Sequence, residues 1–155
     1  MAYCYKYPHP AVTADCIVVA TDNQQRPCVL LIQRKHEPCQ GQWAFPGGFM
    51  NIDETTEEAA IRELEEETGI RIANDAICQV GAYSAVDRDP RERVITVAYL
   101  VTLPQICQVA GRDDAACAQW FPLSELPPLA FDHPQILADA LIILKGERKR
   151  HNKFE

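Results

Sequence analysis

Three glutamates within one short segment have the spacing expected of metal ligands carried by a helix. Glu63, Glu66 and Glu67 stand at positions i, i+3 and i+4, so an α-helix would place their carboxylates on one face. Like charges held this close repel one another and oppose folding unless a cation neutralises them. A divalent metal with oxygen ligands would do so, which points to chemistry on phosphate groups.

The segment that contains these glutamates, residues 47–70, has the signals of a loop followed by a capped helix. It reads GGFMNIDETTEEAAIRELEEETGI and holds eight of the chain's 22 acidic residues. Thr55 and Glu58 fit a capping box at a helix start. Gly69 suits the left-handed residue that ends a helix. We therefore predict a helix from about residue 56 to residue 68.

Two further features of the segment would support a metal or phosphate site. Gly47 and Gly48 have no side chain to obstruct the approach of an ion or a phosphate to the backbone. Arg62 precedes Glu66 by one helical turn and can hold its carboxylate by a charge-assisted hydrogen bond.

Written as a spacing, the segment resembles the Nudix box of the Nudix hydrolases at every defined position. The pattern is Gly48-x5-Glu54-x7-Arg62-Glu63-Leu64-x-Glu66-Glu67-x-Gly69-Ile70. The resemblance implies an α/β (α+β) fold, a Nudix-type α/β/α sandwich around a mixed β-sheet with a catalytic loop-helix-loop. It also implies Mg²⁺ (Mn²⁺ is possible) bound by Glu63, Glu66, Glu67 and the Gly47 carbonyl, with Arg62 completing the catalytic group.

The rest of the chain supplies the strands and helix that such a fold requires. Apolar β-type runs occupy residues 14–20, 27–35, 94–103 and 115–123, and residues 134–149 have the spacing of a C-terminal helix with Pro134 in its first turn. At 155 residues the chain fits one domain. Residues 1–10 are aromatic and proline-rich, and we predict an arm that packs on the domain or on a neighbouring subunit.

Segments outside the box resemble the ADP-ribose pyrophosphatase branch of the family. They are LIQRKHEPCQGQWAFPGGF, RDPRERV followed by TVAYLV, and WFPLSELPPLAFDHPQIL. The resemblance implies a homodimer and hydrolysis of ADP-ribose to AMP and ribose 5-phosphate. Regulators of NAD metabolism share these segments but carry a C-terminal winged-helix domain, and this chain ends at residue 155, which favours the enzyme.

Three positions depart from the patterns of the related enzymes. Glu92 replaces the glycine expected within RDPRGR, and Val86 replaces a proline common in ADP-ribose hydrolases. In enzymes that remove damaged nucleotides, a glutamate precedes the tryptophan that corresponds to Trp120, and here that residue is Gln119. A carboxylate base would then have to come from elsewhere, with Asp113 or Asp114 as candidates.

Cationic and aromatic side chains outside the box are the candidates for substrate binding. Arginines could hold phosphates or a ribose, and phenylalanines beside the glycines could stack on a base. A solvated turn, surface ion pairs and aromatic core packing are the alternatives. The candidates are Arg34, Phe45, Phe49, Arg88, Arg91 and Arg93.

The sequence is compatible with three functions. The first is Mg²⁺-dependent hydrolysis of a nucleoside diphosphate derivative, with ADP-ribose as the expected substrate. The second is a pyrophosphohydrolase of the MutT type that acts on oxidised nucleoside triphosphates such as 8-oxo-dGTP. The third is a sensor that binds ADP-ribose or a nucleotide without hydrolysing it, which the complete box disfavours.

The composition of the chain limits the partners and the cellular compartment that we expect for it. A net charge of −7 disfavours nucleic-acid binding, which needs a basic surface. We also expect no membrane segment, because the longest apolar runs are too short to span a bilayer. The seven cysteines form no C-x-x-C pair, so we predict free thiols in a reducing cytoplasm.

Overall fold

The computed structural model describes the backbone of residues 2–151 and the side chains of residues 2–147. Met1 and residues 152–155, which the predicted domain includes, lie outside the described residues. The elements in chain order are β1 (Ala11–Thr21), β2 (Pro27–Arg34), β3 (Trp43–Ala44), β4 (Gly47–Phe49), α1 (Thr56–Thr68), η1 (Asn74–Ala76), β5 (Ile77–Tyr83), β6 (Val94–Thr102), β7 (Ala115–Pro122) and α2 (His133–His151).

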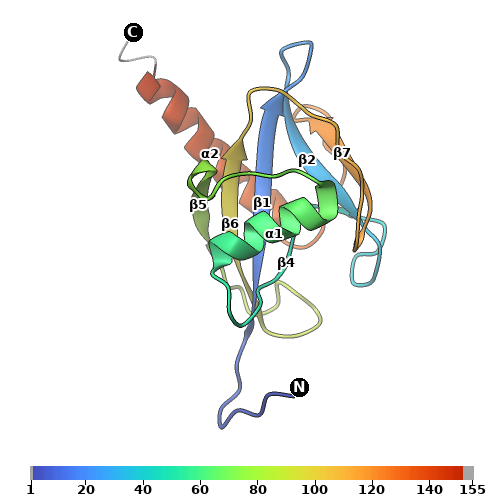
Figure 1. The fold of residues 1–155 in the computed structure, drawn as a ribbon, viewed down its shortest axis with the longest axis vertical. Coiled ribbons are helices and arrows are strands. Elements are labelled where there is room, and N and C mark those ends of the chain that lie inside the picture. The colour runs from blue at the N-terminus through green and yellow to red at the C-terminus, as the bar shows by residue number, and fades with distance from the viewer. Residues whose placement is uncertain (1, 152–155) are drawn as a thin grey trace.

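A mixed seven-stranded sheet forms the centre of the molecule (Figure 1). Its order is β3-β2-β1-β6-β5, with β4 paired to β1 and β7 paired to β2. Only β1 and β6 run parallel among these pairs, and the others are antiparallel. The predicted mixed sheet between helices is therefore confirmed.

One helix covers each face of the sheet, because the side chains of β1 alternate between the faces (Figure 1). Ala14, Cys16 and Val18 pack in the cluster that contains Ala60 and Leu64 of α1. On the opposite face, a second cluster joins β1 to α2; its central members are Ile17, Val19, Ile136, Leu137 and Ala140.

Helix α1 begins and ends where the sequence predicts. Thr55 is the N-cap, and its hydroxyl accepts a hydrogen bond from the Glu58 N–H at 3.2 Å. The Glu58 carboxylate accepts one from the Thr55 N–H at 2.8 Å, which completes the capping box. Gly69 ends the helix with φ of 82°, a conformation that costs glycine little and other residues more.

Because this cap fixes the start of the site-bearing helix, Thr55→Ala is expected to lower the free energy of unfolding by about 1 kcal/mol. The substitution leaves the Glu58 N–H without its side-chain acceptor. Urea unfolding followed by circular dichroism measures the change. Thr55→Ser keeps the hydroxyl and is the matched control, so an equal loss in both variants would contradict a role for the cap.

The N-terminal arm extends away from the sheet (Figure 1). Residues 2–10 are all exposed, with Tyr3, Tyr5 and Tyr7 between 50% and 67% accessible. The expectation that the arm packs on its own domain is therefore wrong, and a neighbouring subunit remains the alternative. Helix α2 extends slightly beyond the predicted 134–149 at both ends.

Candidate active site

A cavity of about 250 Å³ opens where the box segment meets β1, the 35–37 loop and the start of α2. Acidic, cationic and aromatic side chains share its wall. Among the predicted site residues it is lined by Arg34, Phe45, Gly47, Phe49, Glu67, Arg88 and Arg91.

Glu67 is the carboxylate of the box that faces this cavity, although only 4% of the residue is exposed. Its Oε2 accepts a hydrogen bond from the Gly47 N–H at 3.2 Å. Burial, followed by the nearby charge of Glu63, raises its pKa to about 9. A buried carboxylate with one neutral donor and no direct cationic partner among the described residues is suited to binding a metal ion.

Glu63 lies against the second glycine of the box. A Cβ added at Gly48 would lie 2.5 Å from Oε1 of Glu63, so a larger residue at this position would push the carboxylate away. Burial raises the pKa of Glu63 despite its ion pair with Arg62. Gly48 therefore allows the loop to lie directly on this carboxylate.

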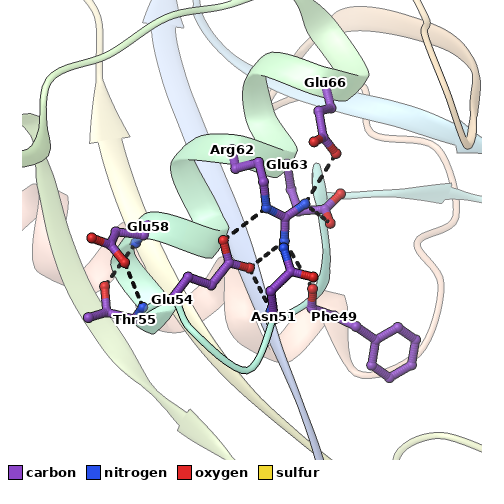
Figure 2. Close-up of polar contacts among 8 residues, drawn as sticks. All are labelled: Phe49, Asn51, Glu54, Thr55, Glu58, Arg62, Glu63 and Glu66. Atoms are coloured by element: carbon purple, nitrogen blue, oxygen red, sulfur yellow. Dashed lines mark hydrogen bonds and ion pairs between the residues drawn. The ribbon is translucent and has the colours of Figure 1, made fainter. Parts of the chain in front are cut away.

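Arg62 connects three carboxylates to the loop before α1 (Figure 2). Its Nη1 donates to Glu63 Oε1 at 2.7 Å and to Glu66 Oε2 at 3.2 Å. Its Nε donates to Glu54 Oε2 at 2.9 Å, and its Nη2 to the Phe49 carbonyl at 3.0 Å. The predicted contact between Arg62 and Glu66 is confirmed, and the arginine also fixes the loop and holds the pKa of Glu54 below its usual value.

The three glutamates differ in exposure, and Glu66 is the most open, with 44% of its side chain exposed. Within the described residues, no three His, Cys, Asp or Glu side chains are gathered as a preformed metal site. Arg62 holds Glu63 and Glu66, while Glu67 points toward Gly47. The donor set still fits Mg²⁺, because it offers carboxylate oxygens, a Glu67 bound by one neutral donor, and a loop with no side chain at Gly48.

Without divalent metal, this chain is expected to lose stability as the pH rises from about 7 to about 9, above the range in which the buried His133 imidazole, with its lowered pKa, has the opposite effect. The pKa of Glu67 is raised from 4.5 to about 9, so over this range the folded state binds a proton that the unfolded state has released. Mg²⁺ displaces that proton, so its stabilising effect should grow with pH. Thermal melts in EDTA and in Mg²⁺ across this range measure both trends.

Glu67→Gln is the control for this profile, because it removes the titrating group but keeps an acceptor for the Gly47 N–H. It should remove most of the pH dependence of the metal-free protein. An unchanged slope in this variant would mean that other groups cause the effect.

Two of the predicted arginines lie over aromatic rings at the cavity wall. The Arg91 guanidinium carbon lies 5.1 Å from the centre of the Phe49 ring, and that of Arg34 lies 5.0 Å from the centre of Phe131. Phe49 remains 41% exposed. Arg91 is also paired with Asp89 at 2.7 Å. Phe49 therefore offers ring surface for a base, with a cation alongside.

The other three candidates have different positions. Arg88 lines the cavity, but its side chain is 4% exposed and forms a two-pronged ion pair with Asp132 at 2.7 and 2.9 Å. Phe45 is 2% exposed and stacks on His133, which leaves little of its ring for a substrate base. Arg93 is exposed, donates to the Ala85 carbonyl at 3.1 Å and does not line the cavity.

The structure separates the two candidate bases. Asp114 lines the cavity with Glu67, whereas Asp113 lies in a second, open groove beside Glu66. Among the departures, Gln119 lies on β7 away from the cavity, and Val86 is 76% exposed.

The sequence did not predict two residues of the cavity wall, Asp15 and His133, or Thr96, which donates a hydrogen bond to Asp15. Asp15 lies on β1 and His133 begins α2, and both line the cavity. The signal available in the sequence was a lone aspartate within the apolar run ADCIVVA. A charge is buried only where it is paired, hydrogen-bonded or bound to a ligand. Their contact joins residues far apart in the chain, which periodicity does not reveal.

These features define a class of protein, an α/β/α sandwich with a cluster of carboxylates on the helix beside its cavity. A Nudix domain model matches residues 9–140. The chain therefore belongs to the Nudix family, as its box predicts.

Individual relatives agree with this membership. An ADP-ribose pyrophosphatase of Methanocaldococcus jannaschii is 44% identical over 86% of this chain and 74% of its own length. The Nudix domain of Shewanella oneidensis NrtR, solved with ADP ribose, has a TM-score of 0.80 and 29% identity, covering 89% of this chain and 90% of that chain.

A third relative is a bifunctional NMN adenylyltransferase/ADP ribose pyrophosphatase from Francisella tularensis, solved with AMP and a manganese ion. It has a TM-score of 0.77 and 32% identity, and covers 92% of this chain and 43% of that chain.

Proposed function

We propose that this chain hydrolyses the diphosphate bond of ADP-ribose to AMP and ribose 5-phosphate in the presence of Mg²⁺. The observation that carries the proposal is the cavity that joins Glu67 to Arg34, Arg91 and Phe49. The 44% identity to an ADP-ribose pyrophosphatase supports the choice of substrate.

Glu63, Glu66, Glu67 and the Gly47 carbonyl are the proposed ligands of Mg²⁺. When bound, the ion neutralises charge on the diphosphate and lowers the pKa of water. Mn²⁺ is a possible substitute, and a manganese ion is present in the related Francisella structure. Arg62 supports the ligands by holding Glu63 and Glu66 on one side of α1.

The remaining cavity residues have distinct proposed roles. Arg34 and Arg91 place positive charge beside the diphosphate, and Phe49 offers its exposed ring to the adenine. Asp114 accepts the proton of the water that attacks one phosphorus in line with the departing phosphate oxygen.

A substrate panel tests this function. The purified chain is incubated with ADP-ribose, NADH, 8-oxo-dGTP and ordinary nucleoside triphosphates, with Mg²⁺ or EDTA, and the products are separated by chromatography. AMP and ribose 5-phosphate from ADP-ribose, formed only with metal, are the expected result. Pyrophosphate from 8-oxo-dGTP without turnover of ADP-ribose would establish the alternative enzyme. Tight binding of ADP-ribose without turnover would establish a sensor.

We further propose a cytoplasmic homodimer. All seven cysteines are free, which agrees with a reducing compartment. The exposed tyrosines of the arm are the candidate dimer contact. Light scattering of the full chain and of a variant with Tyr3, Tyr5 and Tyr7 replaced by serine measures the change in mass.

No helix in the described part of the chain is long and apolar enough to cross a bilayer.

A further inference from the structure

Asp15 is a buried carboxylate that the proposed metal chemistry does not use. It lies on β1 in the wall of the cavity, and its side chain is only 10% exposed. Its Oδ2 accepts a hydrogen bond from the Thr96 hydroxyl at 2.6 Å. A charge held this far from water needs further partners.

The second oxygen of Asp15 is open to the cavity. No described residue donates a hydrogen bond to Oδ1, yet every fully enclosed side-chain nitrogen or oxygen among these residues has a partner. Oδ1 is therefore within reach of solvent. It lies where a side chain at position 47 would stand, so Gly47 leaves it uncovered.

His133 presents a hydrogen-bond donor beside this acceptor. The Phe45 N–H donates to Nδ1 of His133 at 3.2 Å, so the proton of the neutral imidazole is on Nε2. Burial lowers the pKa of His133, which keeps the ring neutral. Nε2 lies 3.7 Å from Asp15 Oδ2, too far for a hydrogen bond, and its donor is left for a ligand.

A hydroxyl group complements this arrangement, because it can donate to Oδ1 and accept from Nε2–H at the same time. A phosphate would be repelled by the negative charge of Asp15. The edge of a base would need hydrogen-bonding groups spread over a wider, flatter surface. We propose that Asp15 and His133 recognise a ribose hydroxyl of the substrate, an inference that rests on the proposed function.

Both residues are held in place by the surrounding structure. Thr96 fixes Asp15 from β6, and Phe45 stacks on the imidazole with ring centres 4.7 Å apart. Arg88, which also lines the cavity, forms an ion pair with Asp132, the residue before His133. Arg88 thus acts as a positioning residue for the start of α2.

The test combines substrate analogues with near-isosteric variants. We would measure kcat/KM for ADP-ribose and for analogues that each lack one hydroxyl of the terminal ribose or of the adenosine ribose. The variants are Asp15→Asn and His133→Asn, the latter keeping an acceptor for the Phe45 N–H. Asp139→Asn, on α2 and outside the cavity wall, is the matched control.

For ADP-ribose, Asp15→Asn is expected to lower kcat/KM by about 10- to 100-fold, as for loss of a charged hydrogen bond. For the one analogue that lacks the recognised hydroxyl, wild type and Asp15→Asn should differ by less than about threefold. The analogue that shows this convergence identifies which ribose is bound.

Equal losses on every analogue, or no loss on ADP-ribose, would overturn the inference while leaving the proposed function intact. If the wild type does not hydrolyse ADP-ribose, the proposed function fails. The same series is then measured by calorimetry as binding to the wild type and to Asp15→Asn. Convergence in binding affinity would still support the hydroxyl site, and its absence would overturn it.

Discussion

Glu67→Gln is expected to lower kcat by at least about 10³-fold, which corresponds to about 4 kcal/mol of activation free energy. The amide keeps the shape of the side chain and can still accept from the Gly47 N–H. It loses the negative charge that is proposed to hold Mg²⁺ at the cavity. Steady-state hydrolysis of ADP-ribose at saturating Mg²⁺ measures the effect.

Folding should survive this substitution, because the native carboxylate is buried with one neutral hydrogen-bond donor. Glutamine does not have to take up a proton on folding, as Glu67 does with its raised pKa, so the metal-free variant should be at least as stable as the wild type at pH 8. Glu65→Gln is the matched control on the same helix; it removes only the exposed pair with Arg71 and should retain wild-type kcat. Turnover close to wild type in Glu67→Gln would remove the proposed role of Glu67.

The sequence predicts α1 well because its signals are local. The N-cap at Thr55, its capping box with Glu58 and the left-handed turn at Gly69 each involve residues within four positions of one another. The contact between Arg62 and Glu66 follows from helical geometry in the same way. The boundaries of β2, β6 and β7 also lie within one residue of the predicted runs, because long apolar runs are easy to recognise. Strand β1 begins three residues before its predicted run, and the short strands β3 and β4 were not predicted.

What the sequence did not reveal depends on contacts between distant segments. Asp15 meets His133 only because β1 and the start of α2 are brought to one face of the sheet. Arg88 seemed free to bind a phosphate until the fold placed it against Asp132. Phe45 seemed available for stacking, but it is buried in the core cluster with Ile136 and Leu137 and stacks on His133. Identifying the cavity wall therefore required the tertiary arrangement.

Arg62→Ala is expected to destabilise the metal-free protein by about 2–3 kcal/mol. Deleting one partner of a buried ion pair costs about 3–5 kcal/mol, and the loss is smaller here because solvent screens the Arg62 side chain, which is 27% exposed. Glu54 and Glu63, with side chains 12% and 15% exposed, would lose their cation. Urea unfolding in EDTA measures the loss. Arg71→Ala breaks an exposed pair and should change stability by less than about 0.5 kcal/mol.

Adding Mg²⁺ tests whether Arg62 alone neutralises Glu63 or shares that role with the metal. If the ion binds Glu63, it supplies positive charge that the arginine no longer provides, so the destabilisation should be smaller in Mg²⁺ than in EDTA. The loss at Glu54 should persist, because that carboxylate is bound through both Nε and Nη2 of Arg62. Equal destabilisation with and without Mg²⁺ would place the metal away from Glu63, and the proposed ligand set would then be reduced to Glu66, Glu67 and the Gly47 carbonyl.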